Sequence, residues 1–515
     1  MRLSSKQTQI KQHFPVILNL FLLLLLNFHP YTHTHIYIYI CMVDLQRKSR
    51  KMATPEISAR SARLPSDKSH LSVPSSSPVE DASATAAYEL YLRLPELASL
   101  WNAKAFPEWR NETILKPALQ ALEITFRFIS MGLSDPRPYS NHGEWKRRLE
   151  SLAMHEVELI ALICEDEEEG GGSGAPIVEL RSPSGVLTRD RSSQEVWQVP
   201  GASPVVSRTS EASLLPRLAT WEKSEGIASR ILLNIECQMH RCPFTLGLGE
   251  PNLAGKPNLE YDLVVRPSDL HSVKKPSSPP SIRNLENETL FTIHQILESW
   301  LFVARELLKR IVVRLDGKEW EKAASDCWIL EQIWKLLSRV EDLHLLMDPD
   351  DFLHLKNQLA IQATPGSSEA LCFRSAALLE LTRLSNDLKK RVPFILGVEV
   401  DPKGGPRVQD AAMILFHKQS RDDGAVSRVH LLQAFQAIEG AMKSFFFAYR
   451  QLTVTVMGSL EATGESLAHR FLEPPYFPSL DAAKTFLGEF WRRERGGGGA
   501  AAAAFTVNTS ASASK

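Results

Sequence analysis

The region from residue 289 to residue 315 constrains the fold of this chain more than any other, because its apolar residues recur every three or four positions. That period is typical of a long helix with one face in a hydrophobic core. The core-facing positions are Leu290, Ile293, Leu297, Leu301, Ala304, Leu308, Ile311 and Leu315. His294 falls on the same face, which predicts a core histidine with hydrogen-bonded ring nitrogens. Asn287 is expected to cap the helix.

Helical periodicity recurs along most of the chain, and no alternation of apolar and polar residues lasts long enough to predict a sheet. Lys116-Pro117 is expected to open one helix, and Asp348 to cap another with Pro349 in its first turn. We therefore expect an all-α protein with a large helical body. The helices are expected near residues 88–97, 116–129, 141–164, 214–241, 289–315, 318–346, 352–359, 368–391, 407–418 and 428–458.

Residues 1–41 are expected to be a spurious N-terminal extension. Threonine alternates there with histidine, and then isoleucine with tyrosine, as translated dinucleotide repeats would give. Met42 is then the working start and the protein is cytoplasmic. The alternative is a secretory signal, because residues 14–28 form an apolar run after a basic start. That run is shorter than the ~20 residues that span a bilayer. A secreted chain would make Asn111 and Asn287 glycosylation acceptors.

Composition divides the rest of the chain into helical regions and polar segments. Runs of Ser, Pro, Gly and acidic residues predict disorder or loops, and Arg266-Pro267 predicts an extended segment. The expected divisions are a disordered basic and Ser/Pro-rich segment (42–85), an N-terminal helical region (86–250) with a disordered acidic, Gly- and Ser-rich insert (165–210), a Pro/Ser-rich connector (251–285), a C-terminal helical region (286–492) and a disordered Gly/Ala tail (493–515).

The charge balance and the motifs exclude several classes of function. Lysine and arginine total 59 against 60 acidic residues, so we expect neither nucleic acid nor membrane as a partner. Cys237, His240 and Cys242 form a Cys-x-x-His-x-Cys motif, but no second ligand pair follows at zinc-site spacing. The sequence has no phosphate-binding glycine loop, no Gly-x-Ser-x-Gly motif and no clear nucleophile–base pair. We therefore predict no catalytic residue, no metal and no cofactor.

Several long and unusual runs resemble the plant HSPRO family, the nematode-resistance-like proteins. They lie at residues 87–97, 114–123, 246–250, 346–356 and 473–491, and the resemblance extends over most of the chain between the first and the last. It implies a plant stress- and pathogen-responsive regulator that promotes basal resistance. It also implies association with a regulatory subunit, of the βγ type, of the energy-sensing SNF-related kinase complex.

A second and more remote resemblance concerns the fold. The pattern His-Gln-x-x-Glu-x-Trp at residues 294–300 is similar to the substrate-pocket helix of the tryptophan and indoleamine dioxygenases, an all-helical haem family. Residues 347–359 resemble the segment that carries a pocket phenylalanine and, four residues on, an arginine that grips the substrate carboxylate. Residues 371–374 are similar to the Leu-Gln-Phe-Arg that follows in that family.

This second resemblance implies a vestigial ligand pocket made by His294, Phe352, Lys356 and Arg374. Lys356 stands where the dioxygenases have the carboxylate-binding arginine. Lysine keeps the positive charge but loses the two-pronged guanidinium, so carboxylate recognition would be weaker and less oriented.

The haem ligand of that family has no counterpart in this sequence, because Val454 occupies the position of the axial histidine. Valine has no lone pair for iron, so haem retention has no chemical basis. We therefore expect a non-enzymatic interaction protein. Two alternatives stay open: a haem-free sensor of indole or aromatic acids that uses the pocket, and a dioxygenase whose iron ligand has shifted to His417, His430 or His469.

Overall fold

The computed structural model describes residues 88–137, 141–165, 174–178, 213–250, 256–276, 284, 286–351, 354, 375–398, 408–418 and 423–457. All of them fall in one compact unit of the chain. They form helices almost throughout, so the all-α prediction is confirmed. None of the described helices is long and apolar enough to cross a membrane.

The helices before the long central one are α4 (Leu94–Asn102), α5 (Glu112–Ser134), α6 (His142–Glu165), α8 (Leu214–Leu218), α9 (Glu225–Gln238), η3 (Met239–Arg241), α10 (Tyr261–Val265) and α11 (Pro267–Ser272). The central helix and those that follow are α12 (Asn287–Asp316), α13 (Trp320–Glu341), η4 (Asp342–Leu346), α15 (Ala376–Lys389), α16 (Val392–Leu396), α17 (Val408–Lys418) and α18 (Asp423–Met457).

The central helix α12 packs against α5, α13 and α15. Nearly every side chain from Asn287 to Ala304 is buried, including the polar ones. A helix that is buried all round belongs to the middle of a bundle. The residues predicted to face the core, Leu290 to Leu315, are all buried there, so the pattern over 289–315 is confirmed.

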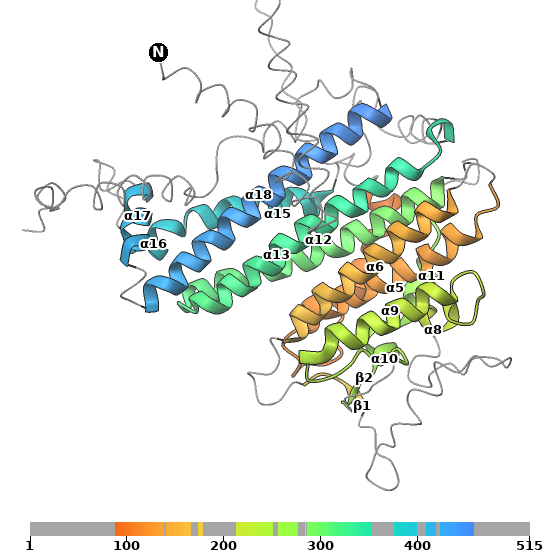
Figure 1. Cartoon of the computed structure of the whole chain (residues 1–515), viewed down its shortest axis with the longest axis horizontal. Coiled ribbons are helices and arrows are strands. Elements are labelled where there is room, and N and C mark those ends of the chain that lie inside the picture. The colour runs from red at the N-terminus through yellow and green to blue at the C-terminus, as the bar shows by residue number, and fades with distance from the viewer. Residues whose placement is uncertain are drawn as a thin grey trace, which may run out of the picture. The chain divides into compact units, whose positions relative to one another are not determined.

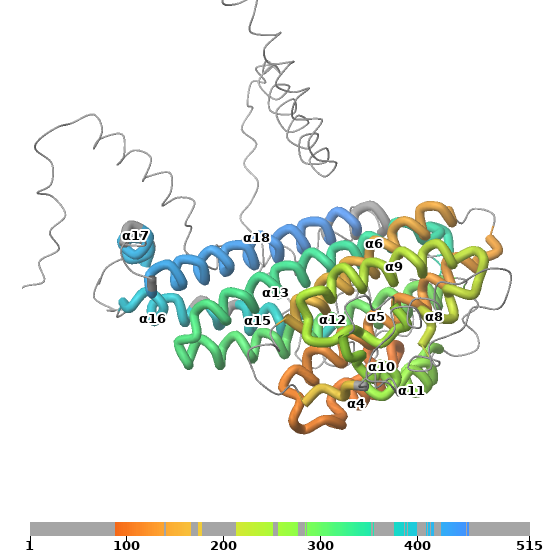
Figure 2. The backbone as a smooth tube through the Cα atoms, turned by 60° about the horizontal axis from the view of Figure 1, so that its bottom comes forward, coloured from red at the N-terminus to blue at the C-terminus, as the bar shows by residue number. Residues whose placement is uncertain are grey.

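The long helices lie side by side, as Figures 1 and 2 show for α12, α13 and α18. A short turn joins α12 to α13, so the two are antiparallel, and α18 packs along α13. On the other flank α5 packs against α6, and α6 against α9. One hydrophobic cluster runs through all of these helices. The two predicted helical regions, 86–250 and 286–492, therefore share one core.

A small antiparallel ribbon is the main departure from helix among the described residues. It pairs β1 (Ile177–Val178) with β2 (Asn258–Leu259), with Ile177 opposite Leu259. Leu259 is fully buried, and Ile177 packs on the same core. Residues 174–178 belong to the insert for which we predicted disorder, so that prediction is wrong for this stretch.

The predicted connector also contains ordered structure. Arg266 does not extend the chain but adopts a left-handed conformation (φ 52°, ψ 62°) between α10 and α11. The proline that follows disfavours the right-handed helical region for Arg266, and the left-handed turn lets both short helices form around it. Tyr261, Val264 and Leu270 bury their side chains in the main core. The prediction of an extended segment is therefore wrong.

Two helices start at residues other than those predicted. In each case a side chain at the start of the helix is hydrogen-bonded to another segment of the chain. Helix α5 begins at Glu112 and holds Pro117 inside it, because the buried Glu112 carboxylate accepts hydrogen bonds from the backbone N–H of Ala105 (2.8 Å) and from Lys116 Nζ (3.0 Å). Asn287 is the first residue of α12 and not its cap, since its Oδ1 accepts from the Tyr91 hydroxyl at 2.8 Å.

The predicted cap at Asp348 is confirmed, because Asp348 Oδ1 accepts a hydrogen bond from the backbone N–H of Asp351 at 2.9 Å.

Candidate functional site

His294 lies in the core, as the helical pattern predicts, with 1% of its surface exposed. Its Nδ1 is 3.4 Å from the Tyr88 hydroxyl, and the two rings meet edge to face with centres 5.8 Å apart. The ring of His344, from η4, lies 5.3 Å away. No described residue forms a hydrogen bond with His294 Nε2. Burial and the neighbouring His344 hold the pKa of His294 well below 6.5, so its ring is neutral.

A buried carboxyl group completes this polar cluster. Glu298 lies one turn after His294 on α12 and accepts a hydrogen bond from the Tyr88 hydroxyl at 2.9 Å. Burial raises its pKa to about 7, although the hydrogen bonds from Ser375 and Tyr88 lower it in part. The cluster joins three parts of the chain: the first helical turn at Tyr88, α12, and the cap of α15 at Ser375.

His344 differs from His294 in the direction of its pKa shift. Burial alone would lower its pKa, but the adjoining Glu341 outweighs burial and raises the pKa above 6.5. His344 Nδ1 is 2.8 Å from the Glu341 backbone carbonyl and 3.2 Å from its carboxylate. The pair therefore consists of a neutral His294 beside a His344 whose pKa is raised. Both side chains are shut off from solvent.

The other residues of the predicted pocket, Phe352, Lys356 and Arg374, lie outside the described residues, as does His469. The side chains of His417 and Val454 are likewise not described, and His430 is exposed on α18. Of the four predicted pocket residues, the structure therefore places His294 alone. The pocket itself stays a prediction.

A second polar hub was missed by the sequence analysis. Glu123 of α5 is fully buried and accepts hydrogen bonds from the Ser213 hydroxyl (2.9 Å), the Leu214 backbone N–H (2.8 Å) and the Tyr261 hydroxyl (3.0 Å). His271 Nε2 lies 3.0 Å from Oε1, the oxygen that also accepts from Leu214. One carboxylate thus anchors α8, α10 and α11 to α5. The sequence signal was the polar side chains at positions 120, 123 and 127, which fall on one face of an otherwise apolar helix.

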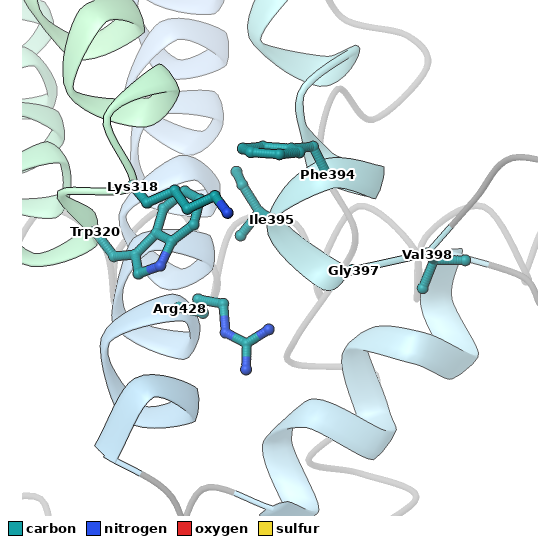
Figure 3. A pocket seen from close by; sticks show the side chains of 7 residues that line it. All are labelled: Lys318, Trp320, Phe394, Ile395, Gly397, Val398 and Arg428. Atoms are coloured by element: carbon teal, nitrogen blue, oxygen red, sulfur yellow. The ribbon is translucent and has the colours of Figure 1, made fainter.

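The described surface carries an open groove of about 480 Å³. Lys318 and Trp320 come from the α12–α13 turn, Phe394 from α16 and Arg428 from α18. Figure 3 shows the charged ends of Lys318 and Arg428 pointing into the same space, beside the two aromatic rings. The ring centres of Trp320 and Phe394 are 5.9 Å apart. This site was not predicted from the sequence, because its residues come from three separate segments.

The Cys-x-x-His-x-Cys motif is split by the fold. Cys237 is exposed on α9, whereas Cys242 is buried and directs its thiol to the Ala161 carbonyl at 3.2 Å. Among the described residues, no group of three or more His, Cys, Asp or Glu side chains is placed to hold a metal ion.

Comparison with known proteins places the whole helical body in one family. Residues 42–236 match the family model described as the Hs1pro-1 N-terminus, and residues 239–493 match the Hs1pro-1 protein C-terminus. The chain is 48% identical to the Arabidopsis thaliana nematode resistance protein-like HSPRO2 over 466 residues, which is 87% of this chain and 99% of that protein. It is 47% identical to HSPRO1 of the same plant over 448 residues, 83% and 97% of the two chains.

No solved structure matches the chain, so the likeness to the dioxygenase fold is not confirmed. The family resemblance, in contrast, holds over nearly the full length of both relatives, at almost one identical residue in two. Two family models together cover the described helices. The chain therefore belongs to the Hs1pro-1 family, the plant proteins named nematode resistance protein-like.

Proposed function

We propose that this protein is a non-enzymatic regulator of plant resistance that acts by binding another protein. The partner that the family resemblance implies is a βγ-type regulatory subunit of the energy-sensing SNF-related kinase complex. The resistance-related role is supported by the names of both Arabidopsis relatives. Partner binding is the mode of action that best suits a chain in which we find no catalytic constellation.

The observation that carries this proposal is the environment of His294. In a ligand pocket its ring would face a cavity, but here the rings of Tyr88 and His344 pack against it and 1% of its surface is exposed. Its neighbours are engaged with one another, as the Tyr88–Glu298 hydrogen bond shows. Such a closed cluster supports a structural role for the residue that most resembles a catalytic one.

The binding test uses the full chain immobilised on a sensor surface. Purified βγ-type regulatory subunit is expected to bind saturably, while the catalytic subunit of the same kinase, supplied alone, is expected not to bind. The His294→Leu variant should bind the regulatory subunit as the wild type does, because this side chain does not reach the surface. A folded chain that fails to bind the regulatory subunit would overturn the proposed partner.

The non-enzymatic part has its own test, an absorption spectrum of the full chain purified from haem-supplemented cells. The expected result is a well-folded helical protein without a Soret band, since Val454 cannot donate electrons to iron. A Soret band in proportion to the protein would instead support a shifted iron ligand and restore the dioxygenase alternative.

A further inference from the structure

The groove is bordered by two helix ends that have the same backbone geometry. At the end of α12, the N–H of Lys318 bonds to the Leu315 carbonyl (3.1 Å) and that of Glu319 to the Arg314 carbonyl (2.9 Å). This pair of bonds defines a Schellman motif, which ends a helix with one residue in the left-handed conformation. Lys318 is that residue, with φ of 60°.

The end of α16 repeats the motif with the expected amino acid. There the N–H of Gly397 bonds to the Phe394 carbonyl (3.1 Å) and that of Val398 to the Pro393 carbonyl (3.0 Å). Gly397 takes the left-handed position, with φ of 67°. Glycine is the usual residue there because a Cβ atom is strained in this conformation. Two matching caps therefore border one groove, and one of them holds a strained lysine where glycine would fit best.

No ion pair with a described residue compensates for the backbone strain at Lys318. No described residue forms a salt bridge with its ammonium group, which lies 5.9 Å from the centre of the Phe394 ring. The carboxylates nearest in the chain are already engaged with other groups, as shown by Asp316 with Arg391, Glu319 with Lys322 and Glu321 with Ser427. Residues held in strained backbone conformations cluster at active sites and ligand-binding sites. A simpler role also exists, because a lysine near a helix C-terminus complements the helix dipole.

The space in front of Lys318 is shaped for an apolar body. Trp320 and Phe394 form its walls, and 48% of the Phe394 side chain is exposed. The fully buried Ile395 lies beneath. A Cβ atom added to Gly397 would meet no atom within 4 Å, so the groove is open at this end. The volume of about 480 Å³ lies in the range of small-molecule sites.

The charged side chains that line the groove favour an anionic ligand. Both ionisable residues among the described lining, Lys318 and Arg428, are cations, and both point into the groove (Figure 3). We propose that this groove binds a small carboxylic acid with an aromatic body, its carboxylate between Lys318 and Arg428 and its ring against the exposed faces of the Trp320–Phe394 pair. This is the ligand class that the sequence suggested for the His294 pocket, placed at a different site. The proposal does not depend on the kinase partner.

Calorimetry on the full chain tests the proposal with a matched ligand pair, 3-phenylpropionate and its uncharged amide. We expect the carboxylate to bind saturably and the amide to bind about tenfold more weakly, since a charge-assisted contact is lost. Lys318→Met and Arg428→Met should each weaken carboxylate binding by a similar factor. The control variant is Lys309→Met, because Lys309 is an exposed α12 lysine paired with Glu306 and outside the groove. It should bind as the wild type does.

The Lys318→Gly variant separates binding from helix capping. Glycine relieves the left-handed strain, so the melting temperature should rise while carboxylate affinity falls. A lysine that serves only the helix end would leave affinity unchanged. Absence of carboxylate binding to the wild type, or equal binding of acid and amide, would overturn the proposal. A third result would also overturn it: no carboxylate binding to the wild type, together with groove variants that weaken binding of the kinase subunit. The groove would then be part of the protein–protein interface.

Discussion

At the scale of single residues, buried carboxyl groups make stability depend on pH. Glu156 of α6 is fully buried and accepts a hydrogen bond from Trp300 Nε1 at 2.8 Å. Burial raises its pKa to about 8, and the hydrogen bond from Trp300 offsets only part of the rise. The folded state therefore keeps a proton that the unfolded chain loses near pH 4.5. The free energy of unfolding therefore falls as the pH rises from about 4.5 to about 8, and it levels off above about pH 8.

Glu156→Gln should remove this dependence, because glutamine can still accept from Trp300 but does not titrate. We expect the variant to match the wild type at about pH 5 and to exceed its free energy of unfolding by roughly 2–4 kcal/mol at pH 8. Urea denaturation at both pH values measures the difference. Equal pH slopes for the two proteins would show that Glu156 is ionised in the folded state.

His294 offers a second test at this scale. Its Nε2 has no hydrogen-bond partner among the described residues, and Tyr88 retains Glu298 as an acceptor. His294→Leu fills most of the same space, so its free energy of unfolding should stay within about 1 kcal/mol of wild type. His294→Ala leaves a cavity and should cost about 2–4 kcal/mol. If leucine costs as much as alanine, the imidazole hydrogen bond and not the packing is essential.

The sequence predicted the burial of His294 because one helix determines it. It did not predict the groove, since Trp320, Phe394 and Arg428 meet only through tertiary packing. Nor did it predict the strain at Lys318. Gly317 comes directly before and is the residue one would assign to the left-handed position, yet its φ is −75°. Which of two neighbours takes that position depends on where the helix ends.

At the scale of elements, the α12–α13 pair is held by an internal charge. Asp326 of α13 is fully buried and pairs with Arg310 and with Arg314, whose guanidinium lies 2.9 Å away. Asp326→Asn keeps the shape but removes the buried negative charge that both poorly solvated arginines contact. We expect the free energy of unfolding to fall by about 3 kcal/mol, measured by urea denaturation.

The control for this prediction is Asp387→Asn on α15. Asp387 also contacts two cations, Arg383 and Lys390, but these ion pairs are on the surface. Exposed pairs contribute little, so no measurable change is expected. If both variants lose the same stability, the buried location of Asp326 has no special effect.

Elements with a long apolar period were predictable from sequence, and α12, α13 and α18 lie close to their expected limits. Short elements were not, because their limits depend on contacts with distant residues. Helix α10 forms where Tyr261 can reach Glu123, and α5 starts early where Glu112 caps the loop before it. Helix α16, only five residues long, has too few positions for a period to be recognised.

At the scale of the whole molecule, the first family model ends at residue 236, in the last turn of α9, and the second begins at residue 239, the start of η3. That boundary does not divide the described structure into separate domains. Hydrogen bonds cross it deep in the core, from Trp300 to Glu156, from Arg127 to Gln295 (2.8 Å) and from Tyr88 to Glu298. Helix α12 lies on the C-terminal side of the boundary but packs against α5 from the N-terminal side.

Fragments cut at this boundary should therefore not fold alone. Residues 1–238 would expose the face of α5 that covers α12, and residues 239–515 would leave the polar groups of α12 without partners, a cost of about 1–3 kcal/mol for each group. We expect neither fragment to show near-UV circular dichroism or a cooperative melt, and the mixture to recover both. The intact chain should melt in one transition. A cooperative melt of residues 1–238 alone would mean that α5, α6 and α9 form a core without α12, and that the family boundary is a true domain boundary.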